Sequence, residues 1–198
     1  ADRIRVGEAD VLIAGGTESM SMVPMMGNKP SMNPRVFDND ENMGIAWGMG
    51  LTAEAVAKQW KVSREDQDAF ALQSHQRAAA AQKAGEFDDE TTPVEVTLRV
   101  PDPASGEVRT STRMAAVDEG VRAEASLEGL AKLRPVFAAS GSVTAGNSSQ
   151  TSDGAGALIV ASTKAVRQFG LTPLARFVSF AVRGVPPRLM GIGPKEAI

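Results

Sequence analysis

Cysteine and tyrosine are missing from this chain of 198 residues, and His75 is its single histidine. The absence of cysteine excludes disulfides and thiolate metal ligands within these residues. A Ser–His–acid triad would need His75, but this residue lies among Gln, Arg and Ala on a predicted helix, where a lone histidine is normally a surface residue. We therefore expect no catalytic residue and no metal site in the chain.

Aromatic residues are scarce, at 5%, and the familiar nucleotide and hydrolase signatures are absent. No Gly-x-Gly-x-x-Gly run follows a predicted strand, and neither the phosphate-binding Gly-x-x-x-x-Gly-Lys run nor Gly-x-Ser-x-Gly occurs. The net charge of −3 gives no electrostatic footprint for nucleic acid. The longest apolar runs are too short to span a bilayer, and no apolar stretch follows the first basic residues. We expect a cytoplasmic protein with no nucleic-acid partner and no membrane span.

Small residues dominate positions 142–156, where several carry hydroxyl or amide groups. Such density lets the backbone approach something closely, either another chain segment or a long, thin ligand. A second unusual stretch, residues 19–49, holds seven of the nine methionines together with several Pro, Gly and Asn. Because methionine is unbranched and adaptable, this stretch either lines a ligand-shaped surface or is an ordinary packed loop.

The predicted elements alternate between helix and strand. We expect the end of a helix over residues 1–9 and a buried strand over 10–14. A helix capped by Thr52 runs to Trp60. A second helix runs from the capping box at Ser63 to Ala84, and Gly85 ends it. Alternation predicts a half-exposed strand over 94–100, which a turn connects to a returning strand over 107–112. A short helix over 126–133, a buried strand over 155–161, a helix over 162–169 and a strand over 174–182 follow.

Strands near both ends of the chain enclose an excursion of over a hundred residues. The order of helix, short turn and buried strand is typical of an α/β fold. An insertion of this length must carry its own structure, and such insertions often form ligand-binding caps. Pro194 suits the first turn of a further helix. The chain ends soon after it and has no initiator methionine, so we expect a fragment of a longer protein.

Five motifs occur in the order and spacing of the thiolase family. They are residues 15–21, residues 49–54 with 63–71, residues 130–137, the small-residue run 142–156, and residues 190–194. Together they cover nearly the whole chain, which resembles this family and, within it, the branch of bacterial 3-ketoacyl-CoA thiolases (acetyl-CoA C-acyltransferases). The resemblance implies an αβαβα layered fold made of two similar α/β halves. It places residues 1–20 and 141–170 in the first half, 21–140 in an inserted loop domain, and 171–198 at the start of the second half.

The family reaction is reversible Claisen chemistry, in which a cysteine takes the acyl group from 3-ketoacyl-CoA and free CoA then receives it. A thiolate suits this task because it is both a strong nucleophile and a good leaving group. By resemblance, the nucleophilic cysteine precedes Ala1, and the family's Gly-His-Pro, second-cysteine and Asn-Glu-Ala-Phe motifs follow Ile198. We therefore expect this piece to be inactive alone. We also expect it to be poorly stable, because its strands lack sheet neighbours.

The chain's share of the family site is CoA recognition. Ser149 resembles the serine that hydrogen-bonds the pantetheine arm, and Ala145 the small residue that lets the arm pass. Leu133 and Phe137 resemble apolar contacts of the loop domain, Arg122 resembles a cation near the nucleotide, and Met49 and Met190 resemble walls of the tunnel. Other interpretations stay open: Leu133 and Phe137 as core, Arg122 as a solvated charge, and Ser149 as a turn hydroxyl.

Two positions depart from parts of the family. Gly48 stands where some members have a histidine, and Gly129 where some have a pocket serine; both fit a degradative enzyme of fatty-acid β-oxidation better than a biosynthetic acetoacetyl-CoA thiolase. A non-catalytic acyl-CoA or lipid carrier and a plain α/β interaction module are the rival hypotheses. The resemblance also implies CoA as co-substrate with no permanent cofactor, a homo-oligomer (dimer or tetramer), and a multienzyme partner in β-oxidation as a further option.

Overall fold

The computed structural model describes residues 1–198, which form two compact units. One unit comprises residues 1–56 and 149–198, and the other comprises residues 57–148. Both mix helix and sheet, as the α/β prediction requires, and each is described by itself.

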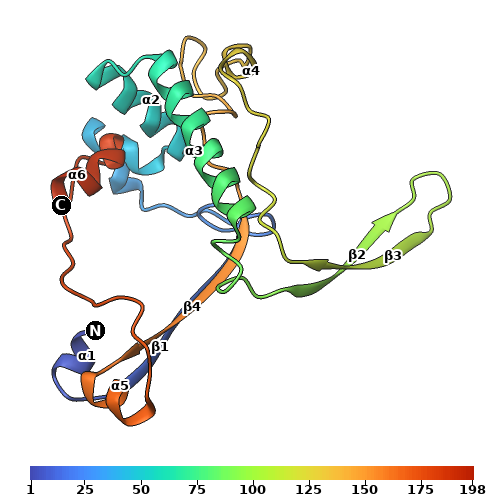
Figure 1. Ribbon diagram of the computed structural model, residues 1–198. Helices are drawn as coiled ribbons and strands as arrows, with labels where there is room; N and C mark the ends of the chain where they lie inside the picture. Colours follow the sequence, from blue (N-terminus) through green and yellow to red (C-terminus); the bar gives the residue numbers. More distant parts are fainter. The chain divides into compact units, whose positions relative to one another are not determined.

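The first unit is organised by a long antiparallel strand pair. Strands β1 (Val11–Ser19) and β4 (Asp153–Ala161) pair over nine positions, from Val11 opposite Ala161 to Ser19 opposite Asp153 (Figure 1). Both strands were predicted, and both extend further than expected. Their predicted burial is wrong for this chain, because the sheet has only two strands: Ile13 is 77% exposed and Ile159 66% exposed.

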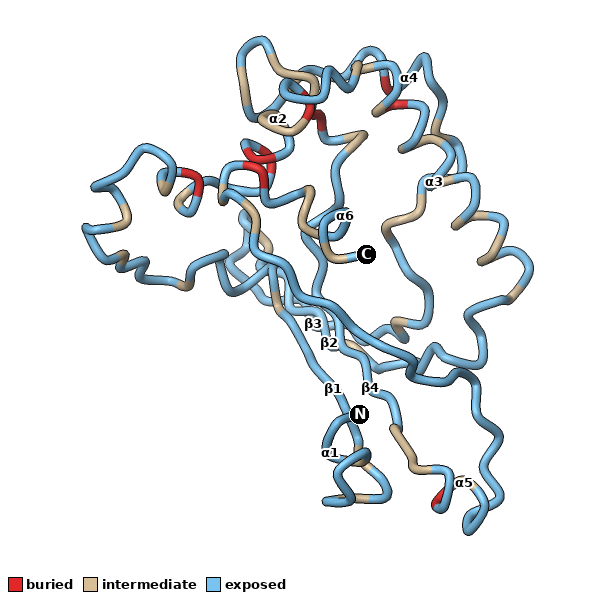
Figure 2. The backbone as a smooth tube through the Cα atoms, turned by 90° about the vertical axis from the view of Figure 1, so that its left-hand side faces the viewer, coloured by how far each residue is buried: buried red, intermediate tan, exposed pale blue.

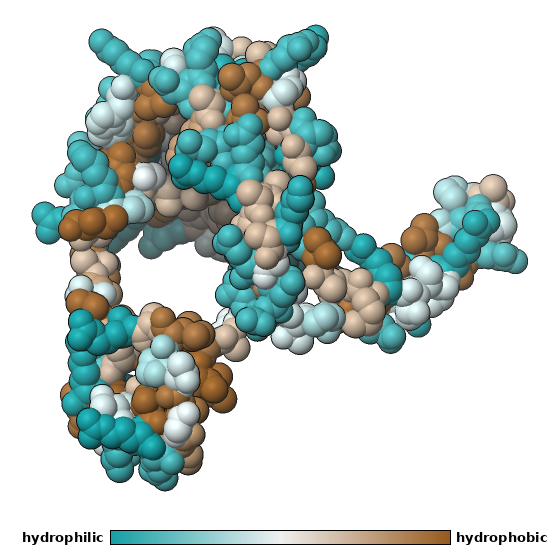
Figure 3. Space-filling view, viewed as in Figure 1, coloured by the Kyte–Doolittle hydropathy of each residue, from teal (hydrophilic) through white to brown (hydrophobic).

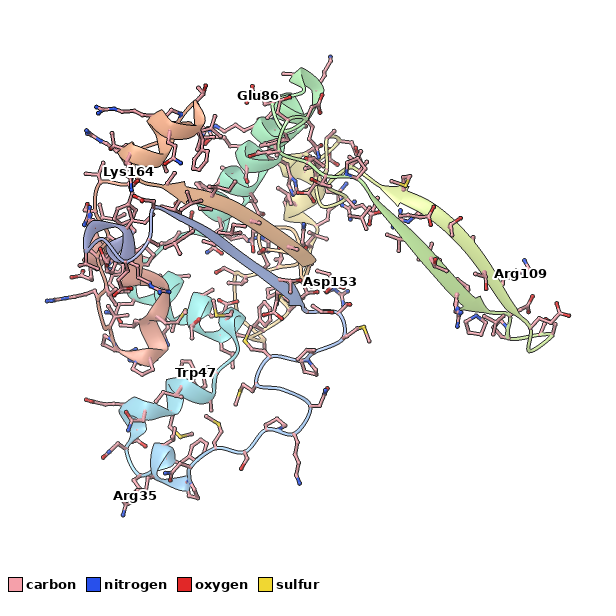
Figure 4. The ribbon with its side chains drawn as sticks, turned by 90° about the horizontal axis from the view of Figure 1, so that it is seen from below. Arg35, Trp47, Glu86, Arg109, Asp153 and Lys164 are labelled. Carbon is pink, nitrogen blue, oxygen red and sulfur yellow. The ribbon has the colours of Figure 1, made fainter.

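Polar side chains fasten both ends of this strand pair. At one end, the Asp10 carboxylate accepts hydrogen bonds from Lys164 Nζ at 2.7 Å and from Ser162 Oγ at 2.8 Å. At the other, Asp153 accepts from the Ser21 hydroxyl at 2.6 Å and its backbone N–H at 2.9 Å. Figure 4 shows Lys164 and Asp153 at opposite ends of the pair. These bonds lower the pKa of both carboxyl groups, and the Asp10 partner raises the pKa of Lys164.

The remaining elements of this unit are short helices. They are α1 (Asp2–Arg5), α5 (Thr163–Phe169), α6 (Gly193–Ala197) and the 3₁₀ helices η1 (Pro34–Phe37), η2 (Asp40–Ala46) and η3 (Pro187–Ile192). Helix α5 lies where a helix was predicted and ends as expected at Gly170, which has φ +62°; its N-cap is Ser162, whose Oγ accepts from Ala165 N. The methionine-rich stretch is not wholly irregular, because η1 and η2 lie within it.

Two predictions for the first unit are wrong. Helix α2 (Met49–Trp60) begins three residues before Thr52, whose hydroxyl donates to the Met49 carbonyl at 2.8 Å, so this threonine is not the cap. Residues 174–182 form no strand. No neighbouring strand pairs with this apolar segment, which Arg5 contacts by a hydrogen bond to the Val178 carbonyl at 3.0 Å and by its guanidinium 5.1 Å from the centre of the Phe177 ring. An apolar segment alone does not make a strand without a partner.

The second unit is built on helix α3 (Arg64–Ala84). Its predicted caps are confirmed: Ser63 Oγ accepts from Asp66 N at 3.0 Å, and Gly85 has φ +72°. Strands β2 (Val94–Pro101) and β3 (Val108–Ala115) form the predicted hairpin, which extends away from α3 in Figure 1. The predicted short helix is α4 (Leu127–Ala131), capped by Ser126.

Few side chains of the chain are buried, as the scarcity of red in Figure 2 shows. The buried apolar residues are Ala57, Leu130, Val143, Ala165 and Leu189. Apolar surface gathers around α1 and α5, seen in brown in Figure 3, where Phe169, Phe177 and Phe180 are exposed. None of the helices has the length and apolar character needed to cross a bilayer.

Candidate functional site

Asp68 is the one buried carboxylate of the chain, at 4% exposure, and it lies one turn into α3. Its Oδ2 atom accepts from Arg64 Nε at 2.8 Å, which makes an i,i+4 ion pair. The other end of the guanidinium donates to the carbonyls of Leu130 at 2.6 Å and Leu133 at 3.1 Å. Arg64 therefore joins the start of α3 to the end of α4.

The second carboxylate oxygen of Asp68 holds the turn of residues 142–148. Asn147 Nδ2 donates to Asp68 Oδ1 at 3.0 Å and to the Ser142 carbonyl at 3.1 Å, while Asn147 Oδ1 accepts from Thr144 N at 2.8 Å. Gln67 Nε2, also from α3, donates to Ser142 Oγ at 2.9 Å. The small-residue run is thus anchored to a helix more than seventy residues away in the sequence.

Packing fixes the same turn from the side of α4. Thr144 is fully buried, and its carbonyl accepts from Ser148 Oγ at 2.7 Å. A methyl group on Gly146 would stand 2.5 Å from side-chain carbons of Leu130 and of Leu133, so both leucine side chains would have to move to admit any larger residue. Ala145, which stands between Thr144 and Gly146 in the sequence, is exposed. The turn therefore exposes Ala145 between two residues that are held in place.

Leu133 and Phe137 lie on the segment that runs beside this turn. Pro135 forms a bridge with Thr144, and Val136 N donates to the Val143 carbonyl at 3.1 Å. Leu133 is 39% exposed and Phe137 45% exposed, so neither belongs to the buried core. Leu133, Phe137 and Ala145, which the sequence grouped as CoA contacts, are therefore brought to one region of the second unit.

Arg122 is exposed and lies in a loop that contacts a later turn of α3. Its backbone N–H donates to Nδ1 of His75 at 3.2 Å, and nearby Gln82 Nε2 donates to the Asp118 carbonyl at 3.1 Å. His75 is only half-exposed, so the surface prediction misses its role in holding this loop against the helix. Seven residues separate Asp68 from His75, which corresponds to about 10 Å along the helix axis. Helix α3 thus sets the spacing between the turn and the backbone of Arg122.

Ser149, Met49 and Met190 belong to the first unit. Ser149 is exposed, and its hydroxyl donates only to the neighbouring Gln150 carbonyl at 3.3 Å, so it stays accessible to a ligand. Met49 begins α2 and Met190 lies in η3, and both are exposed. Their elements are neighbours, because a methyl group on Gly191 would stand 3.6 Å from Val56 of α2.

Other features of the chain do not extend this site. A cavity of about 320 Å³ lies in the second unit where α3 ends and the hairpin begins, lined by Phe87, Val117, Val121 and others. It includes none of the residues predicted to contact CoA. No three His, Asp or Glu side chains cluster in a way that could hold a metal ion.

Sequence reasoning missed the Asp68–Asn147 connection. The i,i+4 spacing of Arg64 and Asp68 signals an ion pair on one face of a helix. Nothing in the sequence indicates that this face meets Asn147, because that contact depends on how α4 and the turn fold back onto α3. Asn147 therefore reads in the sequence as one more polar member of the small-residue run.

The family model and the relatives that match this chain agree with one another. The family model "Thiolase, N-terminal domain" matches residues 1–164. The chain is 50% identical to a 3-ketoacyl-CoA thiolase of Bacillus subtilis and 46% identical to an acetyl-CoA acetyltransferase of Chromobacterium violaceum; each match covers 100% of this chain and 50% of the relative. The chain thus spans about half the length of the curated relatives it matches.

Solved structures agree in fold. The dimeric peroxisomal thiolase of Saccharomyces cerevisiae superposes with a TM-score of 0.80 at 36% identity, over 98% of this chain and 46% of that chain. Human mitochondrial 3-ketoacyl-CoA thiolase in complex with CoA gives a TM-score of 0.76 at 42% identity, over 99% of this chain and 49% of that chain. These matches confirm the thiolase-like α/β fold class, and with the match over residues 1–164 they establish that this chain belongs to the thiolase family.

Proposed function

We propose that the complete gene product containing this chain is a 3-ketoacyl-CoA thiolase, which cleaves 3-ketoacyl-CoA with CoA in fatty-acid β-oxidation. A cysteine thiolate attacks the 3-keto carbon, the bond between C2 and C3 breaks, and the enolate of acetyl-CoA takes up a proton. The thiol of free CoA then takes the acyl group from the enzyme thioester and restores the cysteine. Because these 198 residues contain no cysteine, the nucleophile must come from outside them.

The observation that carries this proposal is the identity to the Bacillus subtilis 3-ketoacyl-CoA thiolase, 50% over the whole of this chain. Gly48 and Gly129, which depart from parts of the family, favour the degradative enzyme over a biosynthetic one. A specific observation also supports acetyl-CoA acetyltransferase as the second candidate: the chain is 46% identical to the Chromobacterium violaceum protein of that name.

The proposed contribution of this chain is CoA binding, with CoA as a co-substrate. The predicted contacts are Leu133, Phe137, Ala145 and Arg122 in one unit and Ser149, Met49 and Met190 in the other. Their exposure and the rigidly held turn around Ala145 support this assignment, as does the CoA complex of the human relative. Backbone exposed at a turn of small residues suits a narrow arm that a larger side chain would obstruct.

Three further expectations belong to the same proposal. The protein forms a homo-oligomer, in line with the dimeric name of the yeast relative, and a multienzyme β-oxidation complex is one setting for it. It acts in the cytoplasm, although the Arabidopsis thaliana and Rattus norvegicus relatives are named as peroxisomal. The domain limits at residues 20, 140 and 170 stay predictions.

The test is a thiolysis assay of the complete gene product with a series of 3-ketoacyl-CoA substrates of increasing chain length. The proposed degradative enzyme cleaves acetoacetyl-CoA and longer substrates with comparable kcat/KM. Activity confined to acetoacetyl-CoA would favour the acetyltransferase. Saturable CoA binding with no cleavage of any substrate would favour the non-catalytic carrier and refute the proposal.

A further inference from the structure

Both oxygens of the Asp68 carboxylate are engaged, and their partners belong to different parts of the second unit. Oδ2 holds Arg64, which fixes α4, and Oδ1 holds Asn147, which fixes the turn of residues 142–148. The carboxylate is 4% exposed, so water does not substitute for either partner. A buried carboxylate with two donors is a charged acceptor that a neutral amide cannot replace at both atoms.

The carboxamide of Asn147 is matched to this position. Its oxygen accepts from Thr144 N, so its nitrogen must face Asp68 Oδ1 and the Ser142 carbonyl. This assignment leaves the Asn147 oxygen with a donor and its nitrogen with two acceptors. An asparagine at position 68 would meet this arrangement with an NH2 group opposite Arg64 or opposite Asn147, and either choice sets donor against donor.

The effect of losing the Asp68–Asn147 hydrogen bond depends on which residues of the turn are buried and which are exposed. Thr144 is fully buried and Gly146 is packed on Leu130 and Leu133, while Ala145 between them is exposed. Loss of the Asp68–Asn147 bond therefore removes one anchor of the turn that carries Ala145 and leaves α3 tied to α4 and the segment after it by the hydrogen bonds of Arg64 to the Leu130 and Leu133 carbonyls.

We propose that Asp68, acting through Asn147, is a positioning residue that holds the Ala145 turn in the geometry that binds CoA. This inference rests on the proposed function, in which that turn contacts CoA. Asp68 touches neither substrate nor the reacting atoms, so its loss weakens CoA binding and leaves the chemical step nearly unchanged. Losing one charged hydrogen bond in this place raises the KM for CoA about tenfold.

The experiment uses the complete gene product and varies CoA at saturating 3-ketoacyl-CoA. The expected result for D68N is a KM for CoA raised about tenfold, with kcat within about twofold of wild type.

Asp66→Asn is the matched control. It makes the same chemical change two residues earlier on α3, at an exposed carboxylate that bonds Ser63 and not the turn. Its KM for CoA is expected to equal that of wild type. If D68N gives no folded protein, N147A tests the other partner of the same bond: it removes the hydrogen bonds of Asn147 to Asp68, Ser142 and Thr144 and keeps the ion pair of Arg64 with Asp68.

Each outcome either supports or overturns the positioning role of Asp68. A wild-type KM in D68N or N147A, or a fall in kcat with unchanged KM, would overturn the positioning role while leaving the thiolase proposal intact. A complete gene product with neither thiolysis nor CoA binding would instead refute the proposed function itself, and this inference with it.

Discussion

Gly44→Ala provides a sharp test of the packing in the first unit. Gly44 lies in η2, and a methyl group there would stand 2.4 Å from Arg188 N and 2.6 Å from Arg188 Cα of η3. These are backbone atoms, so no side-chain rotation relieves the overlap, and η2 and η3 must separate. Overpacking of this kind typically costs 1–3 kcal/mol, and the stiffness of the obstacle places G44A near the upper end, at about 3 kcal/mol.

Urea unfolding of the complete gene product measures this effect. Trp47 N donates to the Gly44 carbonyl at 3.2 Å, so the fluorescence of Trp47, labelled in Figure 4, reports on the altered segment. The control is G48A, where the added methyl has no neighbour within 4 Å; its effect is expected to stay within about 0.5 kcal/mol. Equal stability of G44A and G48A would refute the packing of η2 on η3.

Three further results are expected. S63A removes the hydroxyl that accepts from Asp66 N and lowers the free energy of unfolding by about 1 kcal/mol in urea titrations; no change would contradict the cap. The Asp153 pKa is lowered by Ser21, so the bond stabilises the strand pair at neutral pH and this contribution disappears as pH falls below about 4. Hydrogen exchange of β1 and β4 should therefore differ between wild type and S21A at pH 6 and converge in acid; a constant difference would contradict the assignment. The isolated 198-residue chain shows no thiolysis, because it has no cysteine nucleophile; measurable turnover would refute this.

Local signals predicted the helices well. The capping box at Ser63 and the glycine at Gly85 define α3 without reference to the rest of the fold, and Gly170 does the same for the end of α5. These ends depend on hydrogen bonds made within a few residues, which a sequence displays directly. The start of α2 was misjudged because Thr52 bonds back to the preceding turn within the helix.

Strands and the site depended on partners that the sequence does not display. Residues 174–182 have an apolar pattern typical of a strand, yet no partner strand pairs with them, whereas β1 and β4 find each other across more than 130 residues. The CoA-contact residues came from resemblance to the family. The tie from Asp68 to Asn147 could not be predicted, because it arises from the way α3 and the small-residue turn meet in three dimensions.

Product analysis of the complete gene product most directly tests the central claim. The protein is incubated with a 3-ketoacyl-CoA and free CoA, and the thioesters are separated and weighed by mass spectrometry. We predict acetyl-CoA and an acyl-CoA shorter by two carbons, formed in equal amounts. Intact substrate together with tightly bound CoA would contradict the account and identify the protein as a carrier built on a thiolase fold.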